Sequence, residues 1–112
     1  MNYRPYIPQD VGELLDHLAY MMLESPTFKD TTGYFPRQNI DTAFVALNEG
    51  LLVIRKKLGE EQYATLKALS DKMRALFEAY PEDKTGEARA GREIIHEMED
   101  TLRSTAKRKR SE

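Results

Sequence analysis

The spacing of apolar residues along the chain predicts helices. In four separate stretches, apolar positions recur every three or four residues, which places them on one face of a helix. The clearest stretch alternates steps of four and three, as in a heptad seam, through Ile40, Phe44, Leu47, Leu51, Ile54 and Leu58. Strand-type alternation over five or more residues is missing. The four stripes can be buried only against each other, so we predict an all-α fold, an antiparallel four-helix bundle.

Capping and helix-breaking residues set the expected bounds of these helices. Asp10, followed by Glu13, is suited to open the first helix, and Pro26 to end it. Asn39 is a favourable N-cap for the second helix, and Gly59 a natural residue to separate it from the third. Helices are therefore expected near residues 10–24, 40–58, 60–80 and 84–104.

The helix over 40–58 is expected to be the most buried of the four. Val45, Leu52 and Val53 widen its apolar stripe beyond a single seam. Gly50 lies inside this helix, where it costs about 1 kcal/mol relative to alanine. A close crossing of another helix would explain the glycine.

The chain is expected to form one domain with two flanking segments. Its 112 residues are the usual size of a single domain. Residues 1–9 are expected to form an irregular arm because they contain two prolines, 10–104 a single helical domain, and 105–112 a basic tail that frays from Ser104 onward.

Charge is divided unevenly between the body and this tail. Residues 103–112 contain five lysines and arginines against one glutamate, and the whole chain has a formal charge of −2, so the other 102 residues carry −6. Binding to phosphate backbones needs clustered cations, so the acidic body argues against nucleic-acid binding by the domain itself.

The cysteine count and the apolar runs indicate the compartment. Cysteine is absent, which excludes disulfides, thiolate zinc sites and a cysteine nucleophile, and fits a reducing environment. The first fifteen residues contain prolines and acidic residues where a secretory signal needs an apolar stretch. The longest aliphatic run, 51–54, is far shorter than the roughly 20 residues of a membrane span. A cytoplasmic protein without membrane contact is expected.

The candidate metal-binding and catalytic residues lack the further residues that such sites need. Glu93 and His96 have the i, i+3 spacing that helical di-iron bundles use, and Asp100 could join them. That site needs a second such pair, whereas His17 follows Glu13 at i+4. No serine or glycine lies in a nucleophile or phosphate-loop context. We therefore expect no metal, no cofactor and no catalytic residue, and a protein that is not an enzyme.

Two surfaces are candidates for binding a protein partner. The connection between the first two helices is rich in aromatic residues and arginine, as interfaces are, and includes Phe28, Tyr34, Phe35 and Arg37. In the alternative interpretation this loop folds back and its rings cap the open end of the bundle. The second candidate is the acidic face of the fourth helix, with Glu93, His96, Glu97 and Asp100.

Two further interpretations stay open. The basic tail, Lys107 to Arg110, could bind nucleic acid, which would make the chain a small helical regulatory protein. Alternatively, its cations complement the helix dipole and need no function. Val45 and Leu52 could form a second apolar stripe through which two copies associate as a homodimer.

The order of these features resembles a known family. A first helix ends in a proline-containing turn with nearby aromatics, the second contains the run from Ala46 to Arg55, and a proline-marked turn precedes an alanine-containing fourth. Over about residues 7–100 this is similar to the small all-α immunity proteins that bacteria carry against type VI secretion toxins of the NAD(P)-glycohydrolase kind. The chain differs in its longer 26–39 loop and its basic C-terminus.

The resemblance implies a function but no site residues. It implies a non-catalytic inhibitor that neutralises a secreted toxin by sitting on its active site, and we transfer no functional residue from the family. An acidic body would speed its association with a basic toxin.

Overall fold

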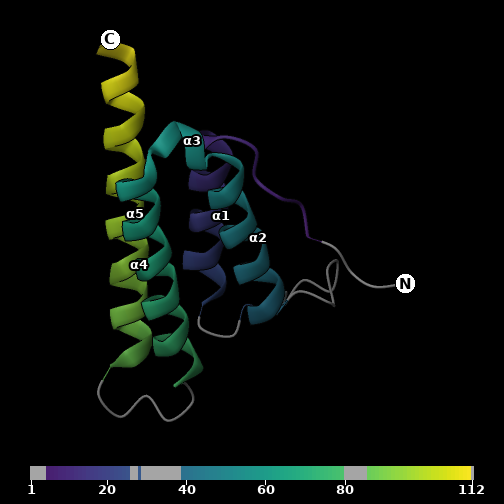
Figure 1. Cartoon of the computed structure of the whole chain (residues 1–112). Coiled ribbons are helices and arrows are strands. Elements are labelled where there is room, and N and C mark those ends of the chain that lie inside the picture. The colour runs from purple at the N-terminus through teal and green to yellow at the C-terminus, as the bar shows by residue number, and fades with distance from the viewer. Residues whose placement is uncertain (1–4, 26–27, 29–38, 80–85, 112) are drawn as a thin grey trace.

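The computed structural model describes residues 5–25, 28, 39–79 and 86–111, and within these ranges it contains helices and no strand. The helices are α1 (Val11–Glu24), α2 (Ile40–Val53), α3 (Arg55–Leu58), α4 (Glu60–Glu78) and α5 (Glu87–Ser111) (Figure 1). The predicted all-α fold is confirmed.

The four long helices form a bundle in which each is antiparallel to both of its neighbours (Figure 1). The extensive contacts join α1 with α2, α2 with α4, α4 with α5, and α5 back to α1. The order around the bundle is therefore α1, α2, α4, α5. Apolar spacing alone does not reveal this order, because each stripe would be buried equally well beside any other.

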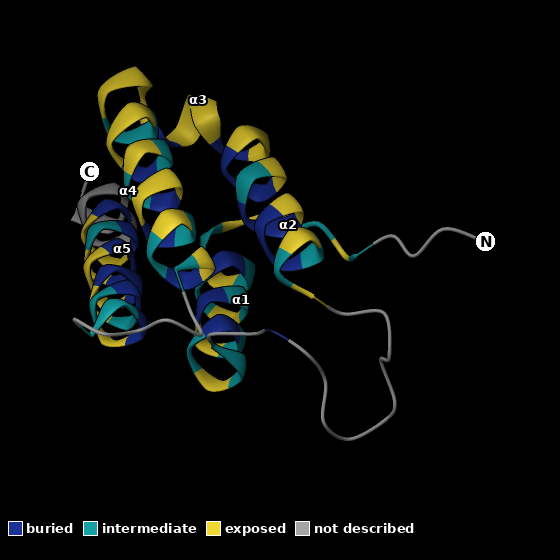
Figure 2. Cartoon of the chain, turned by 90° about the horizontal axis from the view of Figure 1, so that it is seen from below, coloured by how far each residue is buried: buried dark blue, intermediate teal, exposed yellow. Residues whose placement is uncertain are grey.

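Much of the core consists of apolar residues at the predicted helical spacing, although Leu15, Met22, Leu69 and Leu76 at that spacing are only half-buried. Figure 2 shows buried positions on the facing sides of the helices and exposed positions on their outer sides. The largest fully buried side chains on the four long helices are Leu14, Leu18, Met21, Phe44, Leu47, Leu51, Leu66, Met73, Phe77, Ile95 and Met98.

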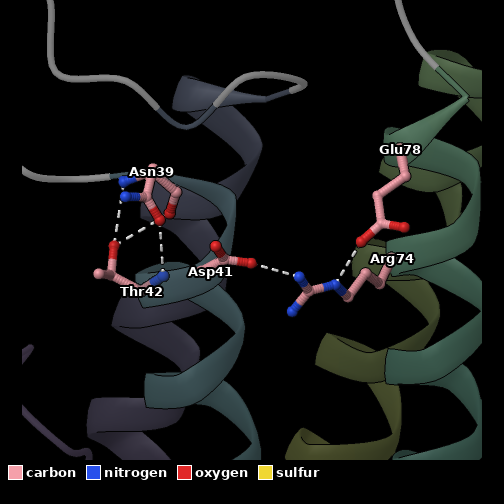
Figure 3. A network of polar contacts seen from close by, with 5 residues as sticks. All are labelled: Asn39, Asp41, Thr42, Arg74 and Glu78. Atoms are coloured by element: carbon pink, nitrogen blue, oxygen red, sulfur yellow. Dashed lines mark hydrogen bonds and ion pairs between the residues drawn. The ribbon is translucent and has the colours of Figure 1, made fainter.

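Side-chain hydrogen bonds fix the starts of α1 and α2 as expected. The Asp10 carboxylate accepts from the Glu13 backbone N–H at 2.8 Å. Asn39 and Thr42 exchange side-chain and backbone hydrogen bonds in a reciprocal capping box (Figure 3). Beside that cap, the Arg74 guanidinium on α4 bonds to Asp41 of α2 and, at 2.5 Å, to Glu78 one turn along α4 (Figure 3). These contacts connect α2 to α4 at the end of the bundle where α2 begins.

Gly50 lies at a close crossing, as the sequence suggested. A Cβ atom there would lie 2.9 Å from Leu14 Cδ2 and 3.2 Å from the Pro8 ring. The absence of a side chain at Gly50 lets α1 and the N-terminal arm approach α2 this closely without displacing Leu14 or Pro8. Residues 5–9 of the arm form no helix or strand, and Pro8 is buried.

The expected helix over 40–58 is wrong in two respects. It is interrupted at Ile54, whose backbone N–H is shared between the carbonyls of Gly50 and Leu52, so α3 is a separate turn. Val45, Leu52 and Val53 are exposed by 47, 46 and 48% and do not widen the buried stripe. In the bundle, α2 packs against two long helices, α1 and α4. The side of α2 that carries Val45, Leu52 and Val53 faces neither of them and is therefore exposed.

The expected end of the last helix at residue 104 is also wrong. Helix α5 continues to Ser111. Thr105 is buried and its hydroxyl donates to Gln62 Oε1 of α4 at 2.5 Å, so the packed part of α5 extends beyond Ser104. Backbone hydrogen bonding needs no apolar pattern, and alanine, lysine and arginine are strong helix formers.

Candidate functional site

Phe28, the first of the loop residues predicted to meet a partner, is part of the core. Its side chain is fully buried, and its ring meets Phe44 of α2 and Phe77 of α4 edge to face, with centroids 5.9 and 5.1 Å apart. We call these three residues the aromatic cluster. Phe28 therefore caps the end of the bundle, and its assignment to a partner surface is corrected. The reason is geometric: two rings already line this end, and a third completes the edge-to-face set.

The backbone at Phe28 is adapted to this packing. Its φ of 59° lies in the left-handed region, which costs a residue with a side chain on the order of 1 kcal/mol. Its N–H continues the helical pattern by donating to the Glu24 carbonyl at 2.8 Å. The burial of a full phenyl ring outweighs this strain. The other loop residues proposed as contacts, Tyr34, Phe35 and Arg37, lie outside the described residues.

The second predicted surface lies on the outer side of α5. The side chains of Glu93, His96 and Asp100 are 70, 68 and 82% exposed, and Glu97 is exposed as well. Residues spaced by three, four and seven lie on one helical face, so these four groups are adjacent. The structure therefore places them together at the surface.

The contacts within this surface are weak and local. Glu93 lies 3.6 Å from Arg89 and Asp100 lies 3.9 Å from Arg103, in exposed pairs of the kind worth less than about 1 kcal/mol. His96 Nδ1 lies 3.2 Å from the nearly buried Glu99. In the described part of the chain, no three acidic or histidine side chains are grouped as metal ligands.

A third site, which the sequence reasoning missed, lies between the N-terminal arm, α1 and α2. It is a groove of about 460 Å³. Figure 1 shows the arm beside α2, on the side of the bundle away from α5. The groove is lined by Pro5, Tyr6, Pro8, Glu13, Asp16, His17, Tyr20, Thr42, Ala43 and Ala46. We refer to it as the arm groove. Among the described lining residues, two are acidic and none is a lysine or arginine.

Hydrogen bonds to Glu13 close one side of the arm groove. The Tyr6 hydroxyl donates to both carboxylate oxygens of Glu13, at 2.8 and 3.0 Å, and the Gln9 backbone N–H donates to one of them at 2.7 Å. The Glu13 carboxylate raises the pKa of Tyr6, since it accepts the phenol proton and disfavours a second negative charge. These bonds hold the arm against α1.

His17 provides the polar centre of the groove. Its Nε2 lies 2.8 Å from the Ala43 carbonyl oxygen, and because a carbonyl only accepts, Nε2 carries the proton. Burial lowers the pKa of His17 below 6.5, an effect partly offset by the bond to Ala43. The ring is therefore neutral at physiological pH, and Nδ1 is an acceptor. The ring centroids of His17 and Tyr20 are 5.5 Å apart.

One sequence signal for the arm groove was available. Glu13, Asp16, His17 and Tyr20 recur at steps of three, one and three, which places them on one polar face of α1. The arm and the small residues of α2 that complete the groove come from other parts of the chain, and their approach depends on packing around Gly50.

Comparison of the chain with protein-family models, curated proteins and solved structures finds no match. Within the described residues, every helix is too short or too polar to cross a membrane.

Proposed function

We propose that the chain is a non-catalytic protein-binding domain that works in the bacterial cytoplasm as an immunity protein, neutralising a basic toxin by covering its active site. The observation that supports this most is the outer face of α5. There Glu93, His96, Glu97 and Asp100 are presented side by side on a helix whose opposite face is part of the core. Groups on such a rigid element need little ordering when a partner binds.

The ion pairs at both ends of this face are exposed, so a cation of the partner can take the place of their arginines. Arg89 and Arg103 neutralise Glu93 and Asp100 only loosely, so a cation of the partner can replace them at small cost. Glu97 forms no ion pair within the described residues. An acidic surface of this kind accelerates the encounter with a basic protein and has less effect on the final affinity.

The test uses the product of a toxin gene encoded beside this one, if present, and compares two charge reversals. Glu97→Lys alters the proposed face, and Glu61→Lys on α4 is the control. Both glutamates are exposed, and in each case the threonine four residues later donates its hydroxyl to the backbone carbonyl, at 3.0 and 3.1 Å. Both variants change the net charge equally.

We expect Glu97→Lys to reduce the association rate at low salt roughly three- to tenfold, and Glu61→Lys to change it little. Surface plasmon resonance measures the rates, and survival of cells that express the toxin measures protection. An equal decrease of the association rate in both variants would show that net charge, and not the α5 face, determines binding. Cells that die whether or not this chain is expressed would exclude the immunity function.

The alternative, a regulatory protein that binds nucleic acid, has one observation in its favour. Helix α5 remains helical through the basic run to Ser111 and extends beyond the rest of the bundle (Figure 1). A cationic helix end of this kind is suited to phosphate contacts. Salt-sensitive DNA or RNA binding that is lost when Lys107 to Arg110 are replaced by glutamine would favour this function over the first.

A further inference from the structure

The described lining of the arm groove carries negative charge. Its charged residues within the described part of the chain are Glu13 and Asp16, and neither forms an ion pair there. The neighbouring His17 does not compensate them, because its ring is neutral in this environment. A ligand with a positive charge therefore matches the groove.

The two carboxylates differ in what they offer. Both oxygens of Glu13 already accept hydrogen bonds from the arm, so Glu13 acts mainly as a fixed charge. Asp16 is exposed and accepts no hydrogen bond within the described residues, so both of its oxygens are available. His17 Nδ1 adds a neutral acceptor, because Nε2 carries the proton and Nδ1 forms no hydrogen bond within the described residues.

The remaining walls are aromatic and apolar. Tyr6, Tyr20 and His17 contribute aromatic rings to the lining, and Pro5 and Pro8 contribute apolar side chains. A cation over an aromatic face is attracted by the ring, and a planar cation also stacks on it. The groove thus combines carboxylate acceptors with ring faces around a hollow of about 460 Å³.

From this arrangement we infer that the arm groove receives an arginine side chain of a partner protein. The inference rests on the proposed function in one respect, namely that the partner is a protein. Guanidinium satisfies each feature: it pairs with a carboxylate through two parallel N–H groups, and it stacks on aromatic rings. A lysine ammonium is a strongly hydrated point charge that uses the ring faces less well.

The experiment needs no identified partner. The full chain, labelled with ¹⁵N, is titrated with N-acetyl-arginine amide, and the backbone amide shifts are followed by NMR. The matched probes are the corresponding capped citrulline, which is nearly the same shape without the charge, and capped lysine, which has the charge without the planar group.

We expect the arginine probe to shift the amides of Asp16, His17 and Ala43 with roughly millimolar affinity, which is the range of a single side-chain contact. Capped citrulline should leave them unchanged, and capped lysine should bind several-fold more weakly. Asp16→Asn should weaken the arginine probe about three- to tenfold. Asp100→Asn on α5 is the control of equal charge and should have no effect.

Three results would overturn the inference. The first is absence of groove shifts with arginine, or equal shifts with lysine. The second is an equal response of Asp16→Asn and Asp100→Asn, which would indicate attraction by net charge alone. The third is groove shifts that depend on protein concentration without any probe, which would identify a second copy of this chain as the occupant.

Failure of this inference is distinguishable from failure of the proposed function. The arginine titration reports on the arm groove and needs no toxin, whereas the Glu97→Lys comparison reports on the α5 face. Loss of either result leaves the other measurement unaffected.

Discussion

The aromatic cluster and the arm groove are two ring-rich regions that border α2, and they differ in whether the chain itself fills them. In the aromatic cluster, Phe28, Phe44 and Phe77 occupy the space between the helices. At the arm groove α2 contributes Ala43 and Ala46, which are too small to fill the space beneath the arm. Large side chains close one region into core, and small ones leave the other open for a ligand.

The two regions also differ in polarity. The aromatic cluster is formed by three phenylalanines, none of which has a polar atom in its side chain. The arm groove contains a neutral histidine and two carboxylates, together with tyrosine hydroxyls. Removing a side chain from the first region should therefore cost stability, while changes in the second should mainly affect binding, the arm or the response to pH. Four predictions test this difference.

The largest effect is expected for Phe28→Ala. Removing the buried ring leaves a cavity beside Phe44 and Phe77, which should lower the free energy of unfolding by about 3 kcal/mol and the Tm by roughly 10–20 °C. Thermal unfolding followed by circular dichroism measures it. The control is Leu23→Ala, which removes a side chain that is 82% exposed and should change the Tm little. Similar Tm values for the two variants would mean that Phe28 is not part of the core.

A smaller loss is expected for Gly91→Ala, although alanine is the better helix former. A Cβ at this position of α5 would lie 2.6 Å from Phe77 Cε1, so the ring that packs against Phe28 would have to move. We expect a net loss of about 1–3 kcal/mol in urea unfolding. Gly12→Ala on α1 is the control, since a Cβ there meets only Asp10 Oδ1 at 3.4 Å, and it should not destabilise. A gain in stability for Gly91→Ala would show that Phe77 moves freely.

The arm groove should make stability depend on pH. The pKa of His17 is lowered in the folded chain from an ordinary value of 6.5, so between these two values the unfolded chain binds a proton that the folded chain does not. The free energy of unfolding should therefore decrease as pH falls below 6.5, and the contribution of His17 should be constant above it. Urea unfolding at about pH 7.5 and about pH 5, for the wild type and His17→Gln, measures this difference. The variant keeps the other titrating groups, so an equal pH dependence in both proteins would contradict the role of His17.

The smallest effect on stability is expected for Tyr6→Phe. The variant removes the hydroxyl that donates to Glu13 but keeps the ring, so the Tm should hardly change while the arm loosens. Hydrogen exchange of the Gln9 amide, which donates to the same carboxylate, should become faster. Tyr63→Phe is the control, because the Tyr63 hydroxyl has no hydrogen bond within the described residues. Unchanged exchange would show that the Tyr6 hydroxyl does not hold the arm in place.

Local pattern determined much of the fold. The period of the apolar residues, with Asp10 and Asn39 as caps, predicted the four long helices and most of their buried faces, because helix formation and capping depend on residues within one or two turns of each other. Gly50 indicated a close helix crossing, because a glycine inside a helix lowers helix stability and a close crossing explains why it is there. The composition also predicted the exposed acidic face of α5, where the residues that share a face are set by the helical period.

Tertiary structure decided which of the available surfaces became core and which became a site. Phe28 and the side chains of Val45 and Leu52 looked alike as apolar residues of uncertain exposure, and only the order of helices around the bundle buried the first and left the others at the surface. The arm groove depends on three segments that meet where Pro8 contacts Gly50. Burial and the approach of distant segments are properties of the whole packing arrangement, so the polar face of α1 was visible in the sequence while the hollow beside it was not.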